Sequence, residues 1–345
     1  MSRVDVIVPC YKYAHYVNGC VNGLLHEQGV DVRVLIIDDC SPDNTPEVAS
    51  ALAAADPRVE YRRHEKNKGH IATYNEGIEW AASEYFMVLS ADDLLTPGAL
   101  GRAARLMDAH PEVGLTYGRA IMTDDPASHP PQIPADYKTK ILQGLEVLEA
   151  FCIEGGNRIP TQTAVVRTSL QKVVGGYKPD LPHSGDMEMW LRFALRAPVA
   201  VIDADQAYYR VHGGNMHIGY VSAVIGDMEQ YKRTFEIVLR ENAQFVPEPD
   251  RARLLQTAMR AIAVRALWKA SDFLEQGDAA GSGQLIDFAS SLCPQLRGER
   301  VWRRLRLKRI VGPRICSALR PALNRIRGTT GKRPPSLRIG MYPKI

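Results

Sequence analysis

The chain has 345 residues, of which 45% are hydrophobic and 24% charged, and its formal net charge is +4. This composition is typical of a soluble globular protein. No run of about 18 apolar residues occurs, which excludes a membrane-spanning helix.

An apolar strand is expected to begin as early as Val4, which leaves no room for a signal peptide. The six cysteines show no Cys-x-x-Cys pairing and no regular spacing. Irregular cysteines of this kind indicate reduced thiols, so we expect a cytoplasmic protein.

The charge is distributed unevenly along the chain. Residues 297–345 contain fifteen Lys or Arg and one acid, Glu299, whereas residues 1–296 contain 28 basic and 38 acidic groups. The sequence therefore predicts an acidic body, with a net charge of −10, and a basic tail.

Strands and helices alternate in the first hundred residues. Short β-branched or apolar runs predict strands, and apolar residues at helical spacing predict helices between them. The expected strands are 4–8, 34–37, 59–61 and 85–89. The expected helices are 17–28, one with Thr45 as its N-cap and Pro46 as its first residue, 71–82 and 97–109. This alternation predicts an α/β fold with a mainly parallel sheet flanked by helices.

The same patterns continue towards the tail. We expect further strands at 113–117, 160–167 and 199–202, the last followed soon after by the segment 209–212. We also expect a loop at 124–138 and helices at 142–153, 183–192, 221–240, 251–276 and 284–292. Residues 300–327 predict one or two basic amphipathic helices, broken at Pro313 and Pro321. The expected domains are an α/β domain at 1–220, a helical extension at 221–296 and the basic tail at 297–345.

Paired acids follow two of the predicted strands, Asp38 and Asp39 after one and Asp92 and Asp93 after the other. Ligands bind at the carboxyl ends of strands in open parallel sheets. A divalent cation with a phosphate-bearing substrate would satisfy Asp92 and Asp93, because Mg²⁺ favours one or two carboxylates plus phosphate oxygens. The alternative is a turn that caps the helix beginning near Thr96. The chain has no Gly-x-Gly-x-x-Gly after its first strand and no Gly-x-x-x-x-Gly-Lys-Ser/Thr, which disfavours dinucleotide and P-loop sites.

Seven short motifs occur in a fixed order between residues 4 and 217. They are Val6-Ile-Val-Pro-Cys-Tyr11, Leu35-Ile-Ile-Asp-Asp-Cys-Ser41, Asn67-Lys-Gly69 with Asn75 and Gly77, Met87-Val-Leu-Ser-Ala-Asp-Asp93, Gly175-Gly-Tyr177, Gly185-Asp-Met-Glu-Met-Trp-Leu-Arg192 and Tyr209-Arg-Val-His212. In this order they make the chain resemble the family 2 glycosyltransferases, which have the GT-A fold. The resemblance covers about two thirds of the chain.

The resemblance implies a pocket for the base of a nucleotide-sugar donor. Pro9, Tyr11 and Asp39 would line it, with Asp39 accepting a hydrogen bond from a base N–H. Asn67 would close over the base or ribose, although a turn explains it equally well. For Asp38 a structural role is favoured, and the alternative for Asp39 is also a turn cap.

The resemblance also implies a bound Mn²⁺ or Mg²⁺. Asp92 and Asp93 match the last two acids of the family's metal-binding segment, while Ser90 replaces the first. We expect Asp93 to bind the metal and Asp92 to assist in nucleotide binding. His212 would reach the metal or the diphosphate, or would be merely a polar loop residue.

Asp186 matches the catalytic base of the family, and Gly185 stands where a Glu is usual. The base would deprotonate the acceptor hydroxyl in a single displacement with inversion. A helix N-terminus lowers the pKa of an acid, so partial burial has to offset that effect. Glu188 is the alternative base, and Trp190 is expected to be core or acceptor-stacking. The acceptor would be a glycan or a lipid-linked intermediate of surface-polysaccharide synthesis.

For the basic tail we expect docking on the cytoplasmic face of an anionic membrane, with Trp302 and Leu305 inserted. Nucleic acid, which the acidic body disfavours, and a protein partner are the alternatives. For the whole chain, the rival functions are a nucleotidyltransferase and a non-catalytic binder of nucleotide sugars.

Overall fold

The computed structural model describes residues 1–215, 224–312 and 337–339. These residues form two compact units. The first contains 1–148, 158–213 and 337–339, and the second contains 149–157, 214–215 and 224–312. The three-part division expected from the sequence stays a prediction, and most of the tail beyond Gly312 lies outside the described residues.

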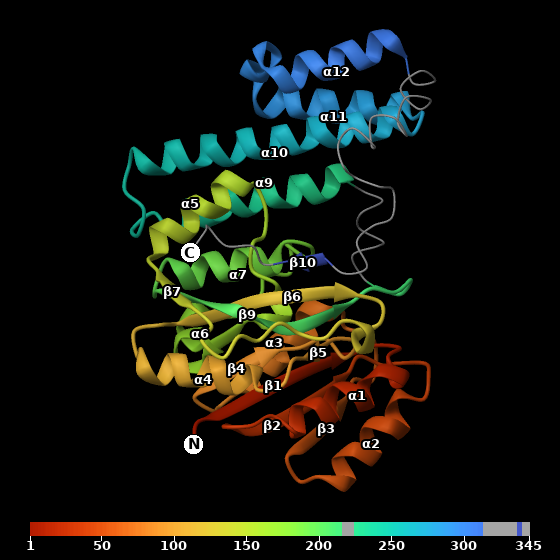
Figure 1. Ribbon diagram of the computed structural model, residues 1–345, viewed down its shortest axis with the longest axis vertical. Coiled ribbons are helices and arrows are strands. Elements are labelled where there is room, and N and C mark those ends of the chain that lie inside the picture. The colour runs from red at the N-terminus through yellow and green to blue at the C-terminus, as the bar shows by residue number, and fades with distance from the viewer. Residues whose placement is uncertain (216–223, 313–336, 340–345) are drawn as a thin grey trace. The chain divides into compact units, whose positions relative to one another are not determined.

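The first unit is built on one mixed, mostly parallel sheet (Figure 1). Its main path runs β3-β2-β1-β4-β8-β6-β9-β5, with β10 paired to β6 and β7 paired to β9. The strands are β1 (Arg3–Cys10), β2 (Asp31–Asp38), β3 (Val59–Arg63), β4 (Tyr85–Val88), β5 (Leu94–Leu95), β6 (Leu115–Thr123), β7 (Thr139–Leu142), β8 (Val165–Arg167), β9 (Val199–Arg210) and β10 (Leu337–Ile339). Neighbours β3, β2, β1 and β4 are parallel, as are β6 and β9, and the pairs formed by β5, β7, β8 and β10 are antiparallel. The predicted fold class is confirmed.

Helices connect the strands of this sheet. They are α1 (Ala14–Leu25), α2 (Thr45–Ala55), α3 (His70–Trp80), α4 (Ala99–Ala109), α5 (Gly144–Glu154), α6 (Thr168–Val174) and α7 (Gly185–Ala194), with short 3₁₀ turns at Pro126–Ser128 and Thr161–Thr163. Thr45 is the first residue of α2 and Asn44 precedes it as the N-cap, one residue earlier than expected.

The alternation of side chains along β1 decides which helices cover each face. Val4, Val6 and Val8 belong to the core cluster that buries residues of α1, α2 and α4. Ile7 points to the opposite face and meets α3, where a Cβ added to Gly77 would lie 2.4 Å from Ile7 Cγ2. Glycine at position 77 thus lets α3 pack closely against the sheet.

The strand expected at 199–202 is longer than the sequence indicated, because β9 has 12 residues and continues to Arg210. Its middle contains Asp203 and Asp205, whose charges interrupt the apolar pattern. Arg119 on the neighbouring strand β6 forms ion pairs with both carboxylates. Arg119, which is distant in the sequence, thus compensates the negative charges of two acids that are otherwise unfavourable within a strand.

The second unit is helical. Its elements include α9 (Val224–Glu241), α10 (Asp250–Glu275), α11 (Ala279–Leu292), the 3₁₀ turn Pro294–Gly298 and α12 (Arg300–Val311), and α10 contacts α9, α11 and α12. No helix in the described part of the chain is long and apolar enough to cross a membrane.

Helix α12 contradicts one expectation for the tail. Leu305, which we expected to insert into a membrane, is only 3% exposed, and the nearby Lys308 is held by Glu275 of α10. Leu307 and Ile310 are instead 63% and 74% exposed. The periodicity of an amphipathic helix does not reveal which of its apolar residues pack inside.

Candidate active site

The loops that follow β1 and β2 meet at the carboxyl edge of the sheet. Lys12 and Cys40, one in each loop, have positive φ angles of 64° and 63°. This conformation is uncommon for residues other than glycine and tends to occur at functional sites. The Lys12 amide donates a 3.0 Å hydrogen bond to Ser41 Oγ, which joins the two loops.

Asp39 holds the loop that leads into α3. Its carboxylate is 5% exposed and accepts hydrogen bonds from His64 Nδ1 (2.7 Å), Lys68 N (2.7 Å) and Gly69 N (2.8 Å). His64 Nε2 in turn contacts Glu76 Oε2 at 2.9 Å. Two of the three bonds fall on Oδ1, so Oδ2 keeps capacity for one further donor such as a base N–H.

The other residues expected around the base lie at the same edge. Pro9 is partly exposed and Tyr11 is 40% exposed, with Lys12 Nζ 5.0 Å from the centre of its ring. Asn67 is exposed, and its Oδ1 accepts from Gly69 N at 3.1 Å, which makes the turn foreseen as its alternative role. Asp38 is fully buried and accepts from Ser41 N and the Tyr61 hydroxyl, a structural arrangement.

Asp92 and Asp93 are buried side by side, 5% and 4% exposed, in the turn between β4 and β5. The amide of Arg210 donates to Asp93 Oδ1 at 2.9 Å, and Arg210 Nε donates to the Asp92 carbonyl at 2.9 Å. His212 Nε2 lies 3.1 Å from Asp92 Oδ2. The end of β9 thus brings His212 to the paired acids, 120 residues away in the sequence.

The surroundings of Asp93 disfavour its charged form, which a bound cation would favour. Burial, and then the charge of Asp92, raise the pKa of Asp93 well above its usual range, because two carboxylates close together resist joint ionisation. Among the described residues, no group of three or more His, Cys, Asp or Glu side chains is arranged to hold a metal. The residues fit a divalent ion whose remaining ligands are substrate oxygens, the usual arrangement for Mg²⁺.

Asp186 is the second residue of α7 and is partly exposed. The Thr161 hydroxyl donates to its Oδ2 at 2.6 Å, and the Tyr177 hydroxyl also hydrogen-bonds to it. Burial raises the pKa of Asp186, while these hydrogen bonds and the charge of His70 oppose that rise. Burial therefore wins over the opposing effects, as a general base requires.

Tyr74 connects the two groups of carboxylates. Burial raises the pKa of its phenol first, and the charges of Asp186, Asp92 and Asp93 raise it further. Its ring lies 5.6 Å from His70 and 5.3 Å from Tyr177, measured between ring centres. The expected base and the expected metal-binding acids thus lie within electrostatic range of one side chain.

Comparison with known proteins identifies the fold around this site. Residues 5–168 match the family model "Glycosyl transferase family 2". This part of the chain is a family 2 glycosyltransferase domain. The chain is therefore a glycosyltransferase, and several of its curated relatives are named as glycosyltransferases or synthases. An uncharacterized glycosyltransferase of Nostoc sp. is 27% identical over 233 residues, which cover 64% of this chain and 68% of the relative.

Other matches are shorter or less identical. The succinoglycan biosynthesis protein ExoO of Rhizobium meliloti is 34% identical over 106 residues, which cover 31% of this chain and 30% of ExoO. The crystal structure of S. aureus TarS 1-349 in complex with UDP-GlcNAc covers 96% of this chain and 93% of its own, with a TM-score of 0.60 and 16% identity. This likeness shows that the chain shares the fold of that glycosyltransferase.

Gly185, which stands where family 2 glycosyltransferases usually have a Glu, lies in a tight space. A Cβ at position 185 would lie 3.1 Å from Tyr177 Cδ1, so a larger residue would press on the ring whose hydroxyl contacts Asp186. Glu188, the alternative base, is 1% exposed and forms an ion pair with Arg192 at 2.7 Å. Trp190 is 4% exposed and belongs to the core.

Four residues of the candidate site were not predicted from the sequence. Tyr13 hydrogen-bonds to Asp92, and its ring lies 5.6 Å from His212, whereas Thr161, Tyr74 and His70 surround Asp186. Tyr13 lies just beyond the first motif and Tyr74 is next to Asn75, so position in the sequence offered a signal for these two. Nothing in the sequence around Thr161 indicated its contact.

Proposed function

We propose that the protein transfers a sugar from a nucleotide-sugar donor to a hydroxyl group of an acceptor, with inversion at the anomeric carbon. The observation that carries this proposal is the grouping of Asp186, Asp92 and Asp93 within range of Tyr74. Asp186 and the acid pair serve two different needs of a displacement reaction. One is a base for the attacking group, and the other is charge stabilisation for the leaving group.

In this mechanism Asp186 accepts the proton of the acceptor hydroxyl as its oxygen attacks the anomeric carbon. The new glycosidic bond forms as the bond between that carbon and the diphosphate oxygen breaks. Thr161 and Tyr177, which hydrogen-bond to Asp186, hold the carboxylate in one orientation. A base whose pKa is raised towards the working pH is better suited to this step than an ordinary aspartate.

The donor would occupy the carboxyl edge between Asp39 and Asp93. Asp39 has acceptor capacity left for a base N–H, and Pro9, Tyr11 and Asn67 lie around it at the same edge. Asp93 and His212, with Asp92 assisting, would hold Mn²⁺ or Mg²⁺, which would supply positive charge to the departing diphosphate. The UDP-GlcNAc in the TarS structure supports a nucleotide sugar as donor.

Polysaccharide synthesis is the proposed setting, supported by the similarity to ExoO, and a glycan or lipid-linked intermediate is the proposed acceptor. Helix α12 supports peripheral attachment to the cytoplasmic face of an anionic membrane. Its exposed residues combine cations and large apolar side chains, namely Arg303, Arg304, Arg306, Leu307, Arg309 and Ile310. Such a surface suits binding at an anionic interface.

The direct test is a screen of the purified protein against UDP-, GDP- and dTDP-sugars with Mn²⁺ or Mg²⁺. Release of the nucleoside diphosphate, by slow hydrolysis or by transfer to an added glycan, is the expected result. Donor binding with no release under any acceptor condition would instead support the non-catalytic binder.

A further inference from the structure

A cavity lies at the opposite edge of the sheet from the candidate active site. It has a volume of about 1100 Å³ and begins at Arg3, the first residue of β1. Strand β1 has eight residues, which at ~3.3 Å per residue puts roughly 23 Å between its two ends. The cavity is thus separate from the site around Asp39 and Asp93.

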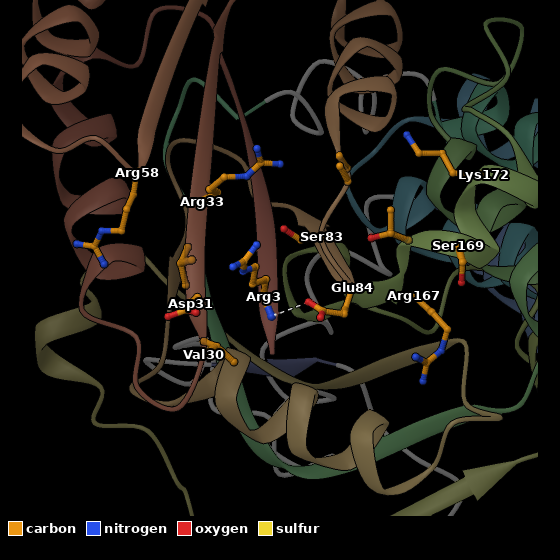
Figure 2. Close-up of a pocket in the computed structure, with 14 residues that line it drawn as sticks. Arg3, Val30, Asp31, Arg33, Arg58, Ser83, Glu84, Arg167, Ser169 and Lys172 are labelled. Atoms are coloured by element: carbon orange, nitrogen blue, oxygen red, sulfur yellow. Dashed lines mark hydrogen bonds between the residues drawn. The ribbon is translucent and has the colours of Figure 1, made fainter. Parts of the chain in front are cut away.

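The lining of this cavity is basic. Among its fourteen residues are two acids, Asp31 and Glu84, and five cations, Arg3, Arg33, Arg58, Arg167 and Lys172. Figure 2 shows Arg3 and Arg33 on neighbouring strands, with Lys172 and Ser169 across from them.

Two of the five cations already have carboxylate partners. Arg33 binds the buried carboxylate of Asp5 at 2.8 Å, and Arg58 binds Asp56 at 2.7 Å. These pairs contribute little free positive charge to the cavity. The case for a ligand therefore depends on the other three cations.

Arg3, Arg167 and Lys172 form no ion pair with a carboxylate among the described residues. The Arg3 guanidinium makes no hydrogen bond within that part of the chain, although its backbone N–H donates to Glu84 at 2.9 Å. The Arg167 guanidinium and Lys172 Nζ donate to backbone carbonyls, for example Val113 O at 3.1 Å and Glu79 O at 3.1 Å. Carbonyl oxygens satisfy these donors without neutralising their charge. Arg167 also hydrogen-bonds to Tyr85 and lies within electrostatic range of Asp108, so Arg3 and Lys172 carry most of the uncompensated charge.

A hydroxyl in the same lining also lacks a partner. Thr168 is 6% exposed, and its Oγ1 has no hydrogen-bond partner in the described structure. A buried hydroxyl without a partner costs free energy, and a ligand that it could reach would offset that cost. The neighbouring Ser169 is exposed and adds a second hydroxyl to the lining.

We propose that this cavity binds a phosphorylated small molecule at a site distinct from the donor site. A phosphate group offers several acceptor oxygens and a double negative charge, which match guanidinium, ammonium and hydroxyl donors. The volume is large enough for more than a single phosphate, because pockets of ~300–1000 Å³ hold drug-sized ligands. This inference does not depend on the proposed glycosyl transfer.

The test is calorimetric titration of the full chain with inorganic pyrophosphate in EDTA, where no divalent ion supports binding at Asp93. We expect saturable binding to one site. Arg3→Ala should weaken it at least about tenfold, the effect of losing a charge-assisted hydrogen bond. Thr168→Val keeps the volume of the side chain and should weaken binding severalfold without unfolding, because the hydroxyl has no partner in the protein.

Two control variants distinguish binding in this cavity from binding at the active site and from attraction to surface charge in general. Lys140→Ala removes the same charge from strand β7, outside the cavity lining, and should bind pyrophosphate as the wild type does. Asp93→Ala should also bind normally. Absence of binding by the wild type, or an equal loss in Lys140→Ala and Arg3→Ala, overturns the inference. Loss in Asp93→Ala places the anion in the active site instead, which also overturns it and leaves the proposed function intact.

Discussion

The hydroxyl of Thr161 donates a 2.6 Å hydrogen bond to Oδ2 of Asp186, across 25 residues of chain. The bond orients the carboxylate and stabilises its charged form, while burial favours the neutral form and raises the pKa of Asp186. Removing the hydrogen bond should therefore raise the pKa of Asp186 further. The identity of the base and its pKa can each be tested by a substitution.

Replacing Asp186 with Asn should leave donor binding nearly unchanged and reduce transfer by about 10²–10⁴-fold, the usual contribution of a general base. Initial rates of nucleoside diphosphate release, together with calorimetry of the donor, measure the two effects. A variant with wild-type turnover would assign the base to another group. Glu188 is a poor substitute, because Arg192 already neutralises it.

The pH profile of kcat/KM should report Asp186. The base acts only when deprotonated, so activity should fall as the pH falls through the raised pKa of this carboxyl group. Thr161→Val removes a hydrogen bond that stabilises the carboxylate, and the acid limb should therefore move to higher pH. Thr139→Val, an exposed change on β7, is the control. An acid limb that stays in place in Thr161→Val would contradict the assigned role.

Asp93→Ala should weaken the binding of nucleoside diphosphate in Mn²⁺, because one of two carboxylates at the proposed cation site is lost. In EDTA the variant and the wild type should bind equally weakly. Asp136→Ala, an acid in an exposed loop, should match the wild type in both conditions. Equal affinity of Asp93→Ala and wild type in Mn²⁺ would remove the metal site from the mechanism.

The combined variant Leu307→Ser and Ile310→Ser should still bind anionic vesicles at low salt but should detach at high salt. Each basic residue near such a surface contributes ~1 kcal/mol, and that attraction is screened by salt, whereas inserted apolar side chains keep part of the binding. Co-sedimentation of the full chain across a salt series measures this. Ile153→Ser, which changes a similarly exposed isoleucine on α5, is the control. Salt curves that coincide for the variant and the wild type would favour nucleic acid or a protein partner.

The sequence predicted the fold well where local patterns carry the information. Apolar runs such as 34–37 and helical spacing such as 71–82 place β2 and α3 nearly where they lie. The apolar pattern did not predict the full length of β9, because Asp203 and Asp205 interrupt it. Their charges are compensated by Arg119, which lies on another strand. The amphipathic pattern also predicted an exposed Leu305, which is buried. Its burial depends on packing against other helices, which the spacing of apolar residues in one helix does not show.

The site shows the same limit. The family motifs brought Asp92, Asp93, Asp186 and His212 into consideration, and the fold places His212 against Asp92. The contact of Thr161 with Asp186 is tertiary and has no local signature.

The turn that carries Asp92 and Asp93 continues directly into β5, which pairs with β9 through Leu94 and Tyr208. The same β9 ends at Arg210, whose amide holds Asp93. The fold itself therefore holds the turn with Asp92 and Asp93 in place before a ligand binds. Little conformational entropy remains to be lost at this point on binding, which favours a rigid, preorganised receptor for the diphosphate.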